Sequence, residues 1–199
     1  NKKRRYSKSS ALIRRQYRVA PDRMSFDPAI LVVPGLRSLQ PYQPGKNVEE
    51  LERELGISGI VKLASNENPR APSASVVRAV TQMLPELSRY PDGGGFYLKQ
   101  ALADQLAVAP GQITLGNGSN DVLELITRAF VQPGQGVIVA QHSFAVYTLA
   151  AISAGADLRV VPAIHWGHDL EGMAEVVDGD SRIIFLANPN NPTGTWVSR

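Results

Sequence analysis

The sequence predicts an α/β fold with a mostly parallel sheet and flanking helices. From Ile113 onward, short apolar segments of strand length alternate with longer segments whose apolar residues recur at helical spacing. After the strand that starts at Ile113, the predicted strands cover residues 136–140, 158–161 and 183–187. Strands that alternate with helices need crossover connections, and strands joined by crossovers pair in parallel.

Three helices and one short strand are predicted before Ile113. Gly56 ends the first helix, and Ser73 or Ser75 caps the second, which Pro85 stops. The helices cover residues 49–55, 74–84 and 97–106, and the strand covers residues 60–64.

The composition is that of a globular protein. A chain of 199 residues that is 43% hydrophobic can bury a core in one or two domains. No apolar run approaches the roughly 20 residues that span a bilayer. Cysteine is absent, which excludes disulfides and thiolate–metal sites. His142, His165 and His168 lack a set of partners for zinc, so no metal site is predicted.

Positive charge is concentrated at the start of the chain. Residues 1–23 contain nine Lys or Arg residues and one acid, Asp22, whereas the rest of the chain has 12 basic and 17 acidic residues. A basic leader is typical of an organelle transit peptide or a nucleic-acid-binding arm. Because Met24 begins a segment that looks like a natural start, we favour an extraneous, disordered extension. The acidic body argues against a nucleic-acid partner.

A loop rich in asparagine and proline follows the last predicted strand. It reads Asn-Pro-Asn-Asn-Pro-Thr-Gly over residues 188–194. The two prolines end the strand and leave carboxamides at its carboxyl end, where open α/β sheets bind ligands. A polar turn between a strand and a helix has the same composition, so this loop alone leaves both interpretations open.

A Gly-Asn-Gly turn at residues 116–118 precedes a predicted helix whose apolar residues, from Val122 to Phe130, recur at helical spacing. Ser119 or Asn120 is the expected cap of that helix. The free N–H groups of a first helical turn, aligned with the helix dipole, suit a phosphate. Any capped helix after a glycine turn has this pattern. The third glycine of the dinucleotide fingerprint is missing, which argues against NAD.

Together with two further segments, these motifs resemble the histidinol-phosphate aminotransferases, which are pyridoxal-phosphate enzymes of fold type I. The further segments are Lys-Leu-Ala-Ser-Asn-Glu-Asn-Pro at residues 62–69 and Arg-Tyr-Pro-Asp-Gly-Gly-Gly at residues 89–95. The resemblance runs from about Phe26 to Arg199. It implies an N-terminal portion of such an enzyme, with an arm and part of the small domain at 24–70 and an incomplete large cofactor-binding domain at 71–199.

The resemblance implies cofactor contacts for five residues. The N–H groups of Ser119 and Asn120 hold the phosphate, and Phe144, where the family usually has tyrosine, stacks on the pyridine ring. Asn191 donates its amide hydrogen to the phenolate oxygen. Tyr90 reaches the phosphate of the neighbouring subunit. The alternative for Phe144 is a residue of the hydrophobic core, and the alternative for Asn191 and Tyr90 is a plain turn residue.

Two more residues are implied on the substrate side, and no catalytic residue is assigned. Tyr42 and Asn66 line the substrate pocket. The alternative for Tyr42 is a residue that only packs. The Schiff-base lysine, the aspartate that pairs with the pyridinium nitrogen and the arginine that holds the substrate carboxylate lie downstream in the family. The 199 residues alone are therefore expected to be inactive.

The whole enzyme implied by the resemblance is a cytoplasmic homodimer. It passes an amino group between histidinol phosphate and the glutamate/2-oxoglutarate pair, in histidine biosynthesis, with pyridoxal phosphate as cofactor and no membrane partner. An aromatic aminotransferase or a threonine-phosphate decarboxylase of the same family is an alternative. A non-catalytic truncated fragment, or a basic-tailed nucleic-acid binder, is the alternative of another class.

Overall fold

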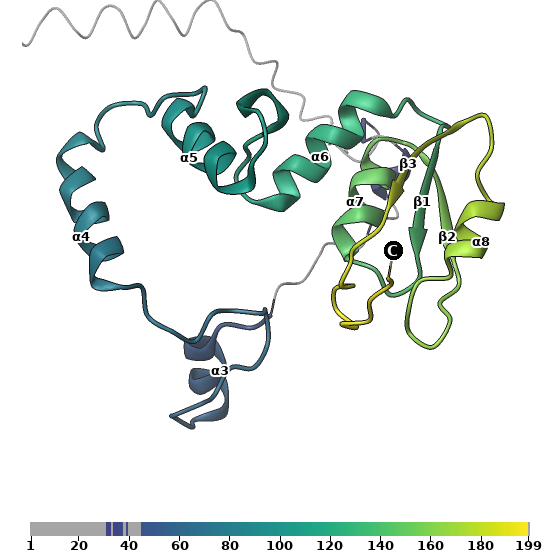
Figure 1. The fold of residues 1–199 in the computed structure, drawn as a ribbon. Coiled ribbons are helices and arrows are strands. Elements are labelled where there is room, and N and C mark those ends of the chain that lie inside the picture. Colours follow the sequence, from purple (N-terminus) through teal and green to yellow (C-terminus); the bar gives the residue numbers. More distant parts are fainter. Residues whose placement is uncertain (1–30, 33, 38, 40–44, 199) are drawn as a thin grey trace, which may run out of the picture.

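A computed structural model describes residues 31–32, 34–37, 39 and 45–198 of the chain (Figure 1). Tyr42 and the basic leader at 1–23 lie outside the described residues, so the predictions made for them stay predictions. Within the described residues, no helix is both long enough and apolar enough to cross a membrane.

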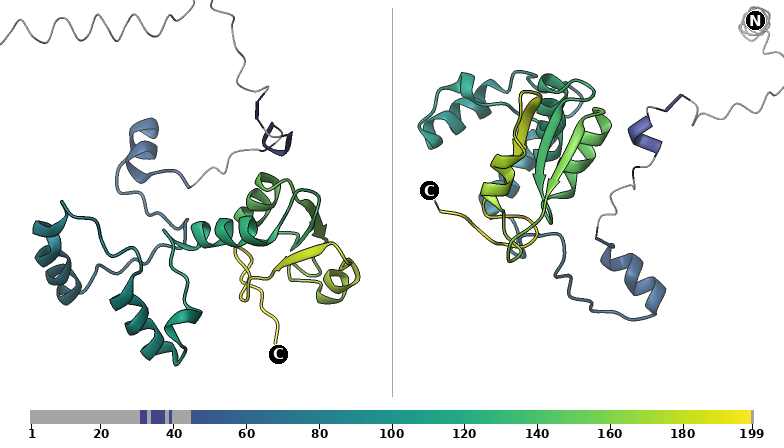
Figure 2. Two further views of the ribbon diagram at one scale, coloured as in Figure 1. Left: turned by 90° about the horizontal axis from the view of Figure 1, so that it is seen from above. Right: turned by 90° about the vertical axis from the view of Figure 1, so that its right-hand side faces the viewer.

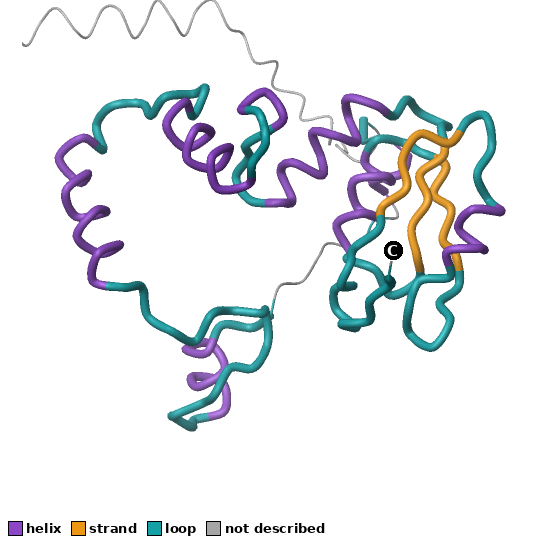
Figure 3. Tube along the Cα trace, viewed as in Figure 1, coloured by secondary structure: helices purple, strands orange, loops and turns teal. Residues whose placement is uncertain are grey.

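A three-stranded parallel sheet forms the centre of the C-terminal half. Its strands are β1 (Gly136–Ala140), β2 (Asp157–Val161) and β3 (Ser181–Phe185), in the order β2-β1-β3. The middle strand, β1, pairs with both neighbours in parallel, with Val139 opposite Val160 on one side and opposite Phe185 on the other. The predicted α/β class with a parallel sheet is therefore confirmed (Figure 3).

Helices cover both faces of this sheet. Figure 1 shows α7 (Ala145–Ser153) and α8 (Leu170–Glu175) on opposite sides of the strands. Successive side chains of a strand point to opposite faces, so β1 contributes to two cores. Val137 and Val139 pack with Ala151 of α7, whereas Ile138 packs with Met173 of α8. All five residues of β1 are buried, which makes β1 the best-protected element among the described residues.

Helix α6 (Ser119–Phe130) packs beside α7 and reaches β3. The cap of α6 differs from the prediction. Gly118, not Ser119 or Asn120, is the N-cap, and no side-chain cap bond forms there. Gly118 has φ 86° and ψ 174°, a conformation that is open to glycine and strained for other residues, so the glycine begins the helix.

Of the remaining helices, α2 (Pro34–Arg37) packs against α7, and the others lie away from the sheet, as Figure 2 shows. Ser73 accepts a hydrogen bond from the Val76 N–H at the start of one helix, as predicted. At the start of another, Asn47, which was not predicted as a cap, accepts from the Glu49 N–H. These elements are α2 (Pro34–Arg37), α3 (Val48–Leu55), α4 (Ala74–Met83), the 3-10 turn η2 (Leu84–Glu86), α5 (Phe96–Leu106) and the 3-10 turn η3 (Pro110–Gln112).

Two of the predicted strands are wrong. Residues 60–64 and the segment that starts at Ile113 form no strand within the described part of the chain. Ile113 has extended backbone angles, φ −112° and ψ 121°, but a strand also needs a neighbour to take up its backbone hydrogen bonds. The last strand is also earlier than predicted: β3 ends at Phe185, which is opposite Val139 of β1, so Leu186 and Ala187 continue past the strand.

Candidate functional site

A cavity of about 560 Å³ lies beyond the carboxyl ends of β1 and β3. The chain leaves β1 for β2 on one side and returns to β3 on the other, so the connections diverge between β1 and β3. Such a switch in strand order opens a crevice that α/β proteins use to bind ligands. The cavity is lined by Ser65, Asn66, Ser143, Phe144, Ala145, Asn191 and Pro192.

Phe144 sits at the start of α7 and faces this cavity with support from behind. It is the N-cap of α7, and its ring meets Tyr147 edge-on with centroids 5.8 Å apart. Tyr147 in turn stacks on Phe185 of β3, with centroids 4.7 Å apart and planes 3° from parallel. Burial raises the pKa of the Tyr147 phenol. The aromatic stack fixes the place of Phe144, which is partly buried and lines the cavity.

Asn191 belongs to a loop that closes on itself. The Asn190 N–H donates to the Thr195 carbonyl at 2.7 Å, and the Gly194 N–H donates to the Asn190 carbonyl at 2.8 Å. Cis peptide bonds precede Pro189 and Pro192. The Asn191 side chain is partly buried at the cavity wall, where its carboxamide can offer both a donor and an acceptor to a ligand.

Asn190 connects the two walls of the cavity, a role that the sequence analysis did not assign. Its side-chain amide donates to the His142 carbonyl at 3.1 Å and to the Thr193 hydroxyl at 2.8 Å. Asn190 is 4% exposed, so this amide is a buried tie between the Phe144 loop and the Asn191 loop. The doubled Asn-Asn in the sequence was the available signal: Asn191 lines the cavity, whereas Asn190 is buried beside it.

Asn66 comes to the same cavity from a distant part of the chain. Ser65 and Asn66 have φ of 75° and 50°, the left-handed region that non-glycine residues rarely adopt. Lys62 and Glu67 form an ion pair of 2.8 Å across this turn. Backbone strain of this kind clusters at binding sites. This turn follows residues 60–64, which form no strand, and it brings Ser65 and Asn66 to the cavity wall.

The first turn of α6 is exposed and does not line this cavity. The first N–H groups of a helix, here including those of Ser119 and Asn120, have no acceptor within the helix. Before them, the Asn117 N–H donates to the Asp121 carboxylate at 3.0 Å. Ser119 and Asn120 are exposed, so their side chains are accessible to a ligand at this helix start.

Tyr90 also lies apart from the cavity. Its side chain is fully exposed, between α4 and α5. The structure therefore brings together three of the predicted residues, Asn66, Phe144 and Asn191, whereas Ser119, Asn120 and Tyr90 lie outside that set.

The cavity suits a small flat ligand that carries an anionic oxygen. Its volume falls within the roughly 300–1,000 Å³ of small-molecule sites. Phe144 offers a ring for stacking, and Asn191 offers an amide N–H for hydrogen bonding. Within the described residues, no group of three or more metal-binding side chains is arranged to hold a metal ion.

Comparisons with known proteins point to one family. The family model for aminotransferase class I and II matches residues 58–199. Histidinol-phosphate aminotransferase 2 of Pseudomonas aeruginosa is 55% identical over 168 residues, which cover 83% of this chain and 46% of the relative. The Haemophilus influenzae protein named histidinol-phosphate aminotransferase 2 is 50% identical over 164 residues, 82% of this chain and 45% of the relative.

Solved structures agree with these sequence matches. Histidinol-phosphate aminotransferase from Sinorhizobium meliloti, in complex with pyridoxal-5'-phosphate, superposes with a TM-score of 0.72 at 31% identity, covering 82% of this chain and 44% of that one. Aspartate aminotransferase from Thermotoga maritima shares the fold with a TM-score of 0.67 at 23% identity, covering 81% of this chain and 46% of that one. The chain thus spans about half the length of the curated relatives it matches.

Proposed function

The chain belongs to the class I and II aminotransferase family, and from this premise we propose that it is the N-terminal part of a pyridoxal-phosphate-dependent histidinol-phosphate aminotransferase. The whole enzyme exchanges an amino group between histidinol phosphate and the glutamate/2-oxoglutarate pair, in histidine biosynthesis. The names of the relatives at 50–55% identity support this substrate.

One observation carries the proposal for the site. Asn66, Phe144 and Asn191 are far apart in the sequence, yet all three line the cavity between the ends of β1 and β3. The sequence resemblance implies a ring contact for Phe144, an oxygen contact for Asn191 and a substrate contact for Asn66. Their meeting at one cavity supports these three roles together.

The residues of the chain have separate tasks in this proposal. Pyridoxal phosphate, when bound, supplies an electron-withdrawing ring that stabilises negative charge on the substrate carbon. Phe144 lines the cavity with its ring supported by Tyr147, so it would hold the cofactor ring by stacking. Asn191 donates its amide hydrogen to the phenolate oxygen, which stabilises negative charge there. Asn66, which also lines the cavity, would contact the substrate.

The phosphate end of the cofactor is assigned to the start of α6. The N–H groups of Ser119 and Asn120 lie in the first turn of a twelve-residue helix, whose dipole favours an anion. This turn does not line the cavity, so we propose that α6 lies closer to Phe144 in the complete enzyme. We assign no catalytic role to the lysines of the described residues.

The complete enzyme is proposed to be a cytoplasmic homodimer. The full exposure of Tyr90 supports a role in which its hydroxyl reaches the phosphate bound by the neighbouring subunit. Tyr42 is proposed to contact substrate, on the resemblance alone.

The test is Asn191→Ala in the full-length enzyme, assayed with histidinol phosphate and 2-oxoglutarate. An oriented donor in a water-excluded site contributes about 3 kcal/mol, so turnover should fall by roughly ten- to a thousandfold. The pH titration of the bound cofactor's absorbance should shift as well. Asn47→Ala, which removes the carboxamide at the start of α3, is the matched control and should leave both unchanged.

The same assays separate the alternatives. Unchanged turnover and an unchanged absorbance titration in Asn191→Ala would remove Asn191 from the site. A wild-type enzyme that prefers an aromatic amino acid, or that releases carbon dioxide from threonine phosphate, would keep the cofactor assignment and overturn the substrate.

A further inference from the structure

The loop that carries Asn191 is anchored at both ends by one short segment of the chain. Before the loop, Nε2 of His168 lies 2.8 Å from the carbonyl oxygen of Ala187. After the loop, the Thr195 hydroxyl donates to the Trp166 carbonyl at 3.2 Å. Residues 166–168 thus hold the residues on either side of the 188–194 loop, although none of them lines the cavity.

The contact with the Ala187 carbonyl fixes which nitrogen of the His168 imidazole carries the hydrogen. A carbonyl oxygen only accepts, so Nε2 carries the hydrogen and donates it. Nδ1 of His168 is buried and has no hydrogen-bond partner among the described residues. The imidazole is therefore used on one side only, as a donor to the chain that leads into the Asn191 loop.

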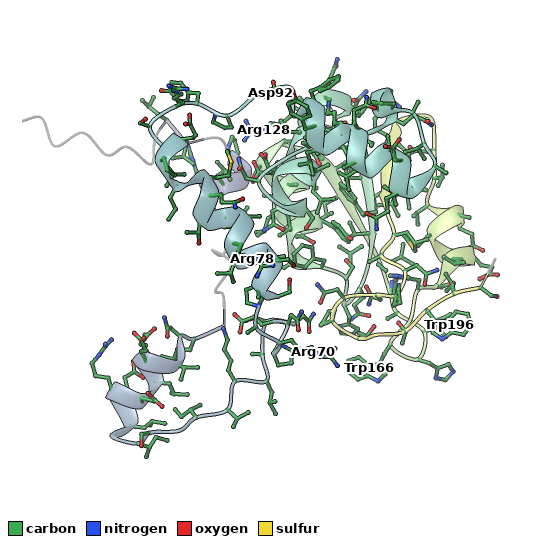
Figure 4. All side chains as sticks on the ribbon, turned by 60° about the vertical axis from the view of Figure 1, so that its left-hand side comes forward. Arg70, Arg78, Asp92, Arg128, Trp166 and Trp196 are labelled. Atoms are coloured by element: carbon green, nitrogen blue, oxygen red, sulfur yellow. The ribbon has the colours of Figure 1, made fainter. Side chains whose placement is uncertain are left out.

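The anchoring segment is itself held on three sides. Ile164 and Gly167 exchange backbone hydrogen bonds of 3.2 and 2.8 Å, which close a tight turn through Trp166. The Trp166 ring lies against His142, with centroids 4.8 Å apart, and Figure 4 shows Trp166 among the side chains at this end of the molecule. Next to His168, the Asp169 side chain caps α8 by accepting from the Gly172 N–H at 3.0 Å.

We propose that His168 is a positioning residue that sets the place of Asn191 in the cofactor cavity. Ala187 lies beyond the end of β3, so its carbonyl is not bound to β1 as the strand residues are. The His168 hydrogen bond replaces that support at the point where the chain turns into the loop. Thr195, bound to Trp166, supplies the second support at the far end. The proposal rests on the proposed role of Asn191.

The experiment uses the full-length enzyme with pyridoxal phosphate and compares two variants of His168. His168→Leu removes the donor and should weaken cofactor affinity by roughly fivefold, the effect of one lost hydrogen bond. It should also shift the pH midpoint of the bound cofactor's absorbance in the direction seen for Asn191→Ala. His168→Gln carries an amide N–H at about the distance of Nε2 and should restore both measurements.

Two more variants control for a general loss of stability. Thr195→Val removes the hydroxyl at the far end of the loop and keeps the shape, so it should cause a smaller shift in the same direction. His165→Asn changes an exposed histidine of the same turn and should cause none. A melting-temperature loss in His168→Leu with no change in the absorbance titration would overturn the positioning role.

The outcomes also separate this inference from the proposed function. A wild-type enzyme that binds no pyridoxal phosphate contradicts the proposed function itself. A wild-type enzyme that binds it, together with a His168→Leu variant of unchanged affinity and unchanged titration, contradicts only the inference about His168. Failure of His168→Gln to restore the wild-type values, when His168→Leu does shift them, would also overturn the donor role.

Discussion

The guanidinium of Arg159 joins β2 to the end of α8 and to the segment before β3. It pairs with Asp157 on its own strand at 2.9 Å and with Asp178 before β3 at 2.8 Å, and it also donates to the Val176 carbonyl at 2.9 Å. The hydrogen bond from Arg159 is the main reason that the pKa of Asp178 falls to about 2, from an ordinary 3.8. The same contacts raise the pKa of Arg159.

This pair makes stability depend on pH in acid. The folded pKa of Asp178 is lower than its ordinary value, so its contribution is complete above about pH 4 and is lost as pH falls towards 2. We expect Arg159→Gln to flatten the stability profile over this window. Denaturant unfolding of both proteins from pH 6 to pH 2 measures this, and parallel profiles would contradict the role of the pair. Arg182→Gln is the control, because this neighbouring arginine donates to the backbone carbonyls of Gly179 and Ser181.

At the same scale, three residues that the sequence resemblance singled out line one cavity: Asn66, Phe144 and Asn191. Asn66 and Asn191 stand in recognisable motifs, and the binding roles of all three stay predictions. Asn190 and His168 could not be predicted, because their roles depend on carbonyl oxygens at His142 and Ala187. A backbone carbonyl is present at every residue, so no pattern of side chains indicates which one a donor will reach.

The start of α5 shows how one element depends on its turn. Gly95 has φ 62°, and a methyl group there would lie 2.3 Å from the Leu115 side chain. The Asp92 carboxylate accepts from the Gly94 and Phe96 N–H groups at 2.9 and 2.8 Å. The Phe96 bond is the main reason that the pKa of Asp92 is lowered. Asp92 and Gly95 together fix where this helix begins.

We expect Gly95→Ala to destabilise the protein by about 1–2 kcal/mol, the cost of placing a side chain in the left-handed region. The contact with Leu115 adds to this cost unless its side chain moves. Gly93→Ala is the matched control, because no atom lies within 4 Å of the methyl group it would add. Equal unfolding midpoints for the two variants in a denaturant titration would show that the turn at Gly95 can relax.

The helices were more predictable than the strands, for a physical reason. A helix satisfies its own backbone, so local signals such as Ser73 and Gly56 were enough to place a helix end. A strand needs a partner that the local sequence does not reveal. The apolar run that starts at Ile113 therefore predicted a strand that does not form, whereas β1 formed as predicted because β2 and β3 flank it.

Across the whole molecule, apolar surface is unevenly covered. The sheet domain buries β1 completely, but α4 exposes a row of large apolar side chains on a helix that lies away from the sheet. About half or more of each of these side chains is exposed: Val76, Val77, Val80 and Met83. Contiguous apolar surface of this kind favours association in water.

We expect the 199 residues by themselves to associate and to show no aminotransferase activity. Lys46 and Lys62 pair with Glu54 and Glu67, and no lysine of the described residues lines the cavity. Sedimentation measures the association. Mixing the chain with pyridoxal phosphate, reducing with borohydride and mapping labelled lysines by mass spectrometry tests the chemistry. One stoichiometric label together with amino transfer from glutamate would overturn this expectation, and scattered partial labelling would agree with it.

The complete burial of β1 has a consequence for how such proteins diverge. Its side chains pack against α7 on one face and α8 on the other, so nearly any substitution within the strand is paid for in stability. The loops after β1 and β3 are packed less tightly, because most of their residues other than the buried Asn190 are partly or fully exposed. Mutations that alter substrate preference can accumulate at the exposed positions of these loops, outside Phe144, Asn190 and Asn191, while the strand stays unchanged, which allows one inherited sheet to serve successive specificities.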